Sequence, residues 1–158
     1  MSIHLILATL AFGAVQDPEN PLNIPPPSAA DMQRCAPPGV TAQTPVSTIP
    51  RARLMEGLHC IQVLIARQIN SVAPLTVDEV TTLVSADAVG PTLQYHYRLD
   101  TDAARFTAAM RDGLSASTRS AACAASLRRS IALGASYRYI WTDRQGRPVH
   151  QLLIERCP

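Results

Sequence analysis

The segment YRYIWTDRQGRPVHQLLIERC, Tyr137 to Cys157, decides the fold that we expect for this chain. Its first aromatic residues, at positions 137, 139 and 141, alternate with Arg138, Ile140 and Thr142, which is the period-two pattern of a β-strand. A turn follows at 143–146, where Gly146 can adopt a positive φ that other residues resist. Residues 149–156 then predict a returning strand, so the segment forms a hairpin whose aromatic face must pack against a helix.

A second hairpin is predicted over residues 75–99. Its turn is the sequence Ala88-Val89-Gly90-Pro91, which favours chain reversal. In the strand that follows, the large residues at 93, 95, 97 and 99 share one face, and Gln94, His96 and Arg98 share the other. The residues before the turn alternate less cleanly, because Asp78 and Glu79 make the start of that strand polar.

Two helices complete the expected elements. The first starts near Pro50, with Ser47 or Thr48 as its cap, and carries an apolar stripe from Leu54 to Ile69 before Pro74 ends it. The second starts at the acidic segment 100–102 and runs to Gly134, a natural helix stop, with a weak stretch at 115–120 where it can break.

The order helix, hairpin, helix, hairpin predicts an α+β fold. The simplest arrangement is a four-stranded, mainly antiparallel sheet with both helices on one face and disulfide bonds holding the ends. The other face would then be polar and open to solvent.

The composition places limits on function. A chain of 158 residues fits one domain with a real core, and its formal net charge of +2 is too small to indicate nucleic-acid binding. All 14 basic residues are arginine and none is lysine. Because these arginines are scattered, codon usage in a GC-rich genome explains them better than selection for anion binding.

Three regions follow from the changes in composition. Residues 1–16 predict a signal peptide, because an apolar run of about thirteen residues is too short to span a bilayer and ends in small residues. Residues 17–50 hold nine of the 13 prolines and predict an extended spacer. Residues 51–158 form the single α+β domain. No transmembrane segment is expected, and the mature protein should be periplasmic or secreted.

The four cysteines, at 35, 60, 123 and 157, suit an oxidising compartment. None is part of a Cys-x-x-Cys pair, which argues against a zinc site or a thioredoxin-like motif. Three pairings are open, and we expect Cys35–Cys60 and Cys123–Cys157, because each joins a segment to its expected neighbour. Four free thiols in a reducing compartment are the alternative.

Candidate functional residues lie on the predicted polar sheet face: Gln94, His96, Arg98, Arg138 and His150. No phosphate-binding loop, nucleophile elbow or metal-binding helix motif is present in the sequence, so we expect no catalytic residue, metal or cofactor. His59 and Cys60 are neighbours on a helix and point about 100° apart, so they cannot act as a catalytic pair. The tyrosines alternate with polar residues and are expected in the core.

The sequence therefore favours a non-enzymatic, exported bacterial binding module that acts on another envelope macromolecule, a protein or a glycan. Inhibitor, immunity and secretion-accessory roles all fit this description. One alternative is a small secreted hydrolase that uses His96 or His150 with a carboxylate. Another is a structural component that assembles into homo-oligomers through an uncovered strand edge.

Overall fold

The computed structural model describes residues 27–41 and 43–158. The predicted signal peptide and the first part of the predicted spacer lie outside the described residues. Within them the elements are α1 (Ala29–Arg34), η2 (Val46–Thr48), α2 (Arg51–Val72), β1 (Leu75–Thr76), β2 (Thr81–Val89), β3 (Thr92–Leu99), η3 (Ala103–Arg105), α3 (Ala108–Ala122), α4 (Ala125–Ala132), β4 (Ser136–Thr142) and β5 (Pro148–Ile154). The α+β class is confirmed.

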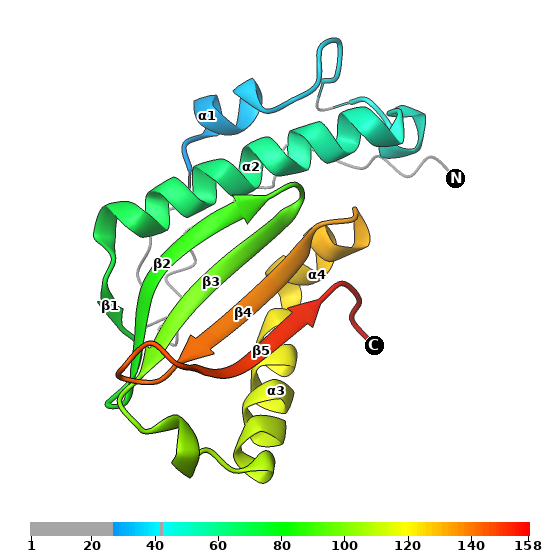
Figure 1. The fold of residues 1–158 in the computed structure, drawn as a ribbon. Coiled ribbons are helices and arrows are strands. Elements are labelled where there is room, and N and C mark those ends of the chain that lie inside the picture. Colours follow the sequence, from blue (N-terminus) through cyan, green and yellow to red (C-terminus); the bar gives the residue numbers. More distant parts are fainter. Residues whose placement is uncertain (1–26, 42) are drawn as a thin grey trace.

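The sheet has five strands in the order β1-β2-β3-β4-β5, where four were expected (Figure 1). The additional strand, β1, has only two residues, and it pairs with Leu83 and Thr82 of β2. Three of the four strand pairs are antiparallel, but β3 and β4 run parallel. The expected order of two separate hairpins is corrected accordingly, because the helical segment between β3 and β4 acts as a crossover that returns the chain to the same end of the sheet.

The predicted second helix is divided into shorter pieces. Asp102 caps η3 through the Ala104 amide, Thr107 caps α3 through the Met110 amide, and α3 ends at Ala122 before α4 starts. At the end of α4, Gly134 has a φ of +105°, and the Ala135 amide donates to the Ser130 carbonyl. This is the bonding pattern of a Schellman cap, so the predicted helix stop at Gly134 is confirmed.

One face of the sheet carries the core. Its register places the side chains of Leu93 and Tyr137, Tyr95 and Tyr139, and Tyr97 and Trp141 side by side. Residues of α2, α3 and α4, including Ile69, Ala122 and Ile131, belong to the same buried cluster. All the larger helices therefore pack on one face, as expected. Burying a large apolar side chain completely contributes about 1.5–3 kcal/mol, and Leu83, Leu93 and Ile154 are fully buried here.

The segment before α2 is attached to the domain. Residues 29–34, expected to be extended, form the helix α1, which Ser28 caps by accepting from the Asp31 amide. Cys35 is buried and bonded to Cys60 of α2. α2 approaches this segment closely at Gly57, where an added Cβ would lie 3.1 Å from the Cys35 carbonyl oxygen.

Both disulfides join the pairs that the sequence analysis expected. Cys35–Cys60 holds α1 against α2. Cys123–Cys157 joins the break between α3 and α4 to the segment after β5. The covalent links therefore fix both ends of the described chain to the helical layer.

Candidate binding surface

The face of the sheet opposite the core forms a regular array of side chains, which we call the open sheet face. The register sets three rows across the strands: Asp87–Gln94–Arg138–Leu153, Ser85–His96–Ile140–Gln151 and Thr76–Thr82–Arg98–Thr142. These side chains are half-buried or exposed, whereas their neighbours along each strand contribute to the core. The predicted binding residues Gln94, His96, Arg98 and Arg138 lie together on this face.

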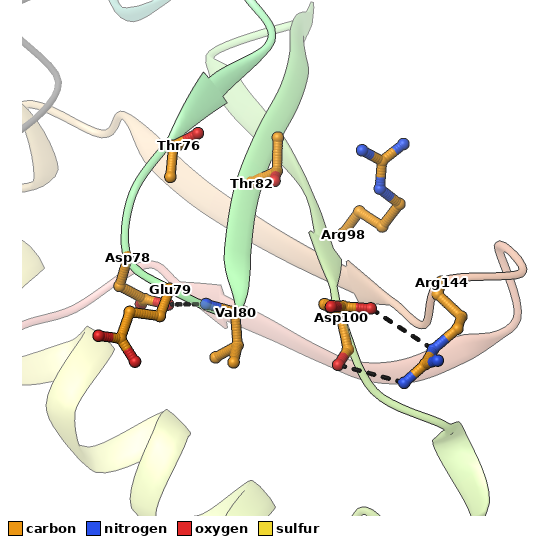
Figure 2. A pocket seen from close by; sticks show the side chains of 8 residues that line it. All are labelled: Thr76, Asp78, Glu79, Val80, Thr82, Arg98, Asp100 and Arg144. Carbon is orange, nitrogen blue, oxygen red and sulfur yellow. Dashed lines mark hydrogen bonds and ion pairs between the residues drawn. The ribbon is translucent and has the colours of Figure 1, made fainter.

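Arg98 lies near the C-terminal end of β3 on the open sheet face. It lines a shallow depression of about 310 Å³ together with Thr76, Thr82, Asp78, Glu79, Val80, Asp100 and Arg144 (Figure 2). Arg144 pairs with the Asp100 carboxylate at 3.5 Å, and Asp78 accepts from the Val80 amide at 2.9 Å. The Arg98 side chain forms no hydrogen bond or ion pair with any residue that the structure describes. Its guanidinium group is therefore available to a ligand.

Arg138 lies at the other end of the same face, between Gln94 of β3 and Leu153 of β5. Its side chain is half-buried, and its Nε atom is buried without a hydrogen-bond partner among the described residues. A buried N–H of a charged group without an acceptor is costly, so such groups normally have a partner.

His96 occupies the centre of the face. Its Nε2 atom lies 2.5 Å from Oδ1 of Asp87 on β2, and both side chains remain substantially exposed. Asp87 is the only acidic residue in the three rows, and its carboxylate is paired with His96. Consequently the unpaired charges of the array are the two guanidinium groups of Arg98 and Arg138.

The structure places His150 on the opposite face, so its predicted place on the polar face is wrong. His150 pairs with Trp141 across β4 and β5, its ring stacks on the Trp141 ring with centroids 5.7 Å apart, and Nε2 contacts the Ser115 hydroxyl of α3 at 2.6 Å. In the regular part of the register His150, Leu152 and Ile154 lie opposite Trp141, Tyr139 and Tyr137, so His150 shares their covered face. The irregularity between Trp141 and Thr142 leaves Val149 without an opposite residue, and Val149 is buried as well.

Sequence reasoning missed two residues that support the site. Asp143 is fully buried at the β4–β5 turn, where it accepts from the amides of Ala103, Gln145 and Arg147 and from the Arg147 guanidinium at 2.7 Å. Burial raises the pKa of Asp143, but the hydrogen bonds from Arg147, Ala103 and Gln145 outweigh it and lower the pKa to about 2. The carboxylate therefore holds the turn beside Arg144. In the sequence Asp143 is visible only as the first residue of an Asp-x-x-Gly turn, and this pattern does not reveal the long-range contact to Ala103.

Asn70 is the second missed residue. At the end of α2 its side-chain amide donates to the Ala86 carbonyl at 2.7 Å and accepts from the Ala86 amide at 2.8 Å. These two bonds occupy the outer edge of β2 next to the part that β1 covers. Asn70 thus takes the place of a neighbouring strand.

The aromatic side chains form a stacked row on the covered face. Tyr95 lies over Tyr139, and Tyr97 lies over Trp141, with ring centroids 5.1 and 5.9 Å apart. Burial raises the pKa of Tyr97 to about 12, and burial together with neighbouring tyrosines raises the pKa of Tyr95 and of Tyr139. These hydroxyls stay protonated at neutral pH. In residues 27–41 and 43–158 no group of three His, Cys, Asp or Glu side chains could hold a metal ion.

Comparison with known proteins identifies the fold. No model of a protein family matches the chain, and no curated protein matches it in sequence. Solved structures do. A proposed secreted protein from Pseudomonas aeruginosa matches with a TM-score of 0.57 and 18% identity, covering 64% of this chain and 91% of that one.

Two further matches are pilotins of type II secretion systems. The pilotin AspS from Vibrio cholerae has a TM-score of 0.54 and 22% identity, covering 65% of this chain and 93% of its own. The pilotin EpsS from Vibrio vulnificus has a TM-score of 0.56 and 14% identity, covering 65% and 92%. This chain is therefore similar in fold to these small proteins over nearly their whole length. No helix in the described part of the chain combines the length and apolarity that a membrane span needs.

Proposed function

We propose that this chain is an exported secretion-accessory protein whose open sheet face binds a protein component of a secretion assembly in the cell envelope. The observation that carries the proposal is the open sheet face itself, where two guanidinium groups without described partners flank half-buried Ile140. An interface commonly combines arginine with apolar residues in this way. The fold likeness to a proposed secreted protein and two pilotins supports the secretion-related role.

The disulfides support the compartment. Two bonded pairs and no free cysteine among the described residues suit a protein that folds in an oxidising environment such as the periplasm. We therefore propose a periplasmic or secreted location for the protein.

A protein partner fits the surface better than a glycan. The side chains that could stack on sugar rings, Tyr95, Tyr97, Tyr139 and Trp141, belong to the core face. The open sheet face has no aromatic residue in its three rows.

The hydrolase alternative used His96 or His150 with a carboxylate, converging in one concave pocket. His96 contacts Asp87 on the open sheet face, whereas His150 contacts Ser115 beneath α3. The two histidines point to opposite sides of the sheet and do not converge, and the His96–Asp87 pair is substantially exposed, so the geometry favours the binding role.

The test is deletion of the gene in the organism of origin, with the amounts of extracellular proteins measured by mass spectrometry. We expect a set of exported proteins to decrease and to recover on complementation with the wild-type chain. Complementation with a double variant, Arg98→Glu and Arg138→Glu, should fail. The matched control is Arg67→Glu, an exposed arginine of α2 on the far side of the sheet. Unchanged extracellular proteins after deletion, or equal rescue by the double variant, would contradict the proposal.

A further inference from the structure

We infer that the open sheet face binds an acidic segment of its protein partner, with one carboxylate bound by Arg98 and a second by Arg138. The inference rests on the proposed function and adds the chemistry of the partner to it. Its basis is charge complementarity: both guanidinium groups lack a counter-ion among the described residues, although an acidic residue shares the row of Arg138 and others line the depression beside Arg98.

Two of the nearby acidic residues already pair with other side chains, so they do not neutralise Arg98 and Arg138. Asp87, on the row of Arg138, is bonded to His96. Asp100, beside Arg98, is bonded to Arg144. The remaining acids of the depression, Asp78 and Glu79, form no ion pair with Arg98 within 4.0 Å. The face therefore keeps two positive charges that an outside carboxylate can neutralise.

Arg138 gives the stronger of the two contacts. The guanidinium of half-buried Arg138 has no acceptor among the described residues, and a carboxylate can accept from two N–H groups of one guanidinium at the same time. Such a bidentate bond would satisfy two N–H groups of the Arg138 guanidinium. Lysine cannot replace arginine in this role, because its single ammonium group lacks the planar fork.

The register sets the spacing of the carboxylates. Arg138 lies opposite Gln94, and Gln94 is four residues from Arg98 along β3. At about 3.3 Å per residue the two arginines are separated by about 13 Å along the strand and by about 4.8 Å across one strand spacing. An extended partner segment with acidic residues at positions i and i+4 has both carboxylates on one side and matches this separation.

The surface between the arginines suits such a segment. Ile140 lies between His96 and Gln151 in the middle row, and it gives the partner an apolar contact flanked by polar ones. An extended acidic segment with an apolar residue at position i+2 would therefore meet Arg138, Ile140 and Arg98 in order.

The experiment uses the purified, oxidised chain and a fluorescent peptide in which two glutamates stand four residues apart around a central valine. The matched peptide has glutamines in place of both glutamates. We expect the glutamate peptide to bind at least about tenfold more tightly, as measured by fluorescence anisotropy, and to weaken with added salt. Equal binding of both peptides, or no binding of either, would overturn the inference.

Variants assign the contacts. Arg138→Gln should weaken binding about tenfold or more, because it removes charge-assisted hydrogen bonds from a half-buried site. Arg98→Gln should weaken it about threefold, because exposed ion pairs contribute less. Arg138→Lys should also weaken binding, while Arg67→Gln should leave it unchanged. Circular dichroism checks that the variants fold. Loss of binding in Arg67→Gln, or no loss in Arg138→Gln, would show that the peptide binds elsewhere.

Vesicles separate an acidic protein from an anionic lipid surface. If vesicles of phosphatidylglycerol bind with the same dependence on Arg98 and Arg138 and the glutamate peptide does not, the face recognises lipid and the inference is wrong. The two proposals fail separately. A secretion defect with no peptide binding refutes only the acidic partner, and peptide binding without a secretion defect refutes only the secretion-accessory role.

Discussion

Exchanging glycine for alanine at two positions of the helical layer should change stability in opposite directions. Gly134 has a φ of +105°, and an added Cβ would lie 2.9 Å from the Met55 Cε atom. Gly113 lies within α3, has no positive φ, and has open space around the added Cβ. The chemical change is the same at both sites, so the difference reports the left-handed backbone at Gly134 together with its contact to Met55.

The magnitudes follow from these two environments. At Gly134 the left-handed conformation costs an L-residue about 1–2 kcal/mol, and a reduced entropy of the unfolded chain offsets about 0.4–1 kcal/mol of that. We expect a net loss of about 1 kcal/mol for Gly134→Ala, and a larger loss for Gly134→Val because the Met55 methyl must move further. At Gly113 the better helix propensity of alanine should stabilise the protein by about 0.5–1 kcal/mol.

Urea denaturation of the oxidised protein measures both values from the midpoint and slope. The reasoning would be refuted if Gly134→Ala were as stable as the wild type, or if the two alanine variants shifted the free energy of unfolding in the same direction.

Three further predictions concern the contacts that hold the fold. The low pKa of Asp143 contributes stability above about pH 4, the range in which an unfolded aspartate is ionised, and this contribution is lost as the pH falls toward 2. In Asp143→Asn the urea midpoint should therefore fall less steeply than in the wild type between about pH 4 and 2. An equally steep fall in the variant would contradict this role of Asp143. Cys123→Ser opens a bond between residues 34 positions apart and should cost about 3–4 kcal/mol under oxidising conditions only; the same melting temperature for variant and wild type without reductant would refute this. Asn70→Ala leaves both polar groups of Ala86 to water and should destabilise by about 1 kcal/mol, whereas the exposed control Arg67→Ala should have little effect; no difference between the two would contradict the role of Asn70.

The sequence predicted those parts of the fold that depend on local periodicity. The alternation over residues 92–99 and 136–142 identified two central strands, and the apolar stripe of α2 identified the longest helix. The polar side of β3 was also predicted correctly, because Gln94, His96 and Arg98 occur at every second position.

Other parts depend on contacts between distant segments. The parallel pairing of β3 with β4 was missed although the signal, a long helical segment between two strands, was present in the chain. His150 shares the period-two face of Leu152 and Ile154, but Val149 is apolar and buried too because the register is irregular there, so the sequence alone left the face of His150 ambiguous. Asn70 was missed, because its partner, the backbone of Ala86, has no sequence signature.

Site-specific photo-crosslinking in the living cell tests the central claim most directly. A photoreactive amino acid replaces Ile140, which lies in the middle row of the open sheet face, and the control carries it in place of Arg67 on α2. We predict an adduct with one component of a secretion assembly from position 140, absent from position 67 and lost when Arg138→Gln is added. An adduct only with a second copy of this chain, an adduct from position 67 alone, or no adduct from position 140 would contradict the account.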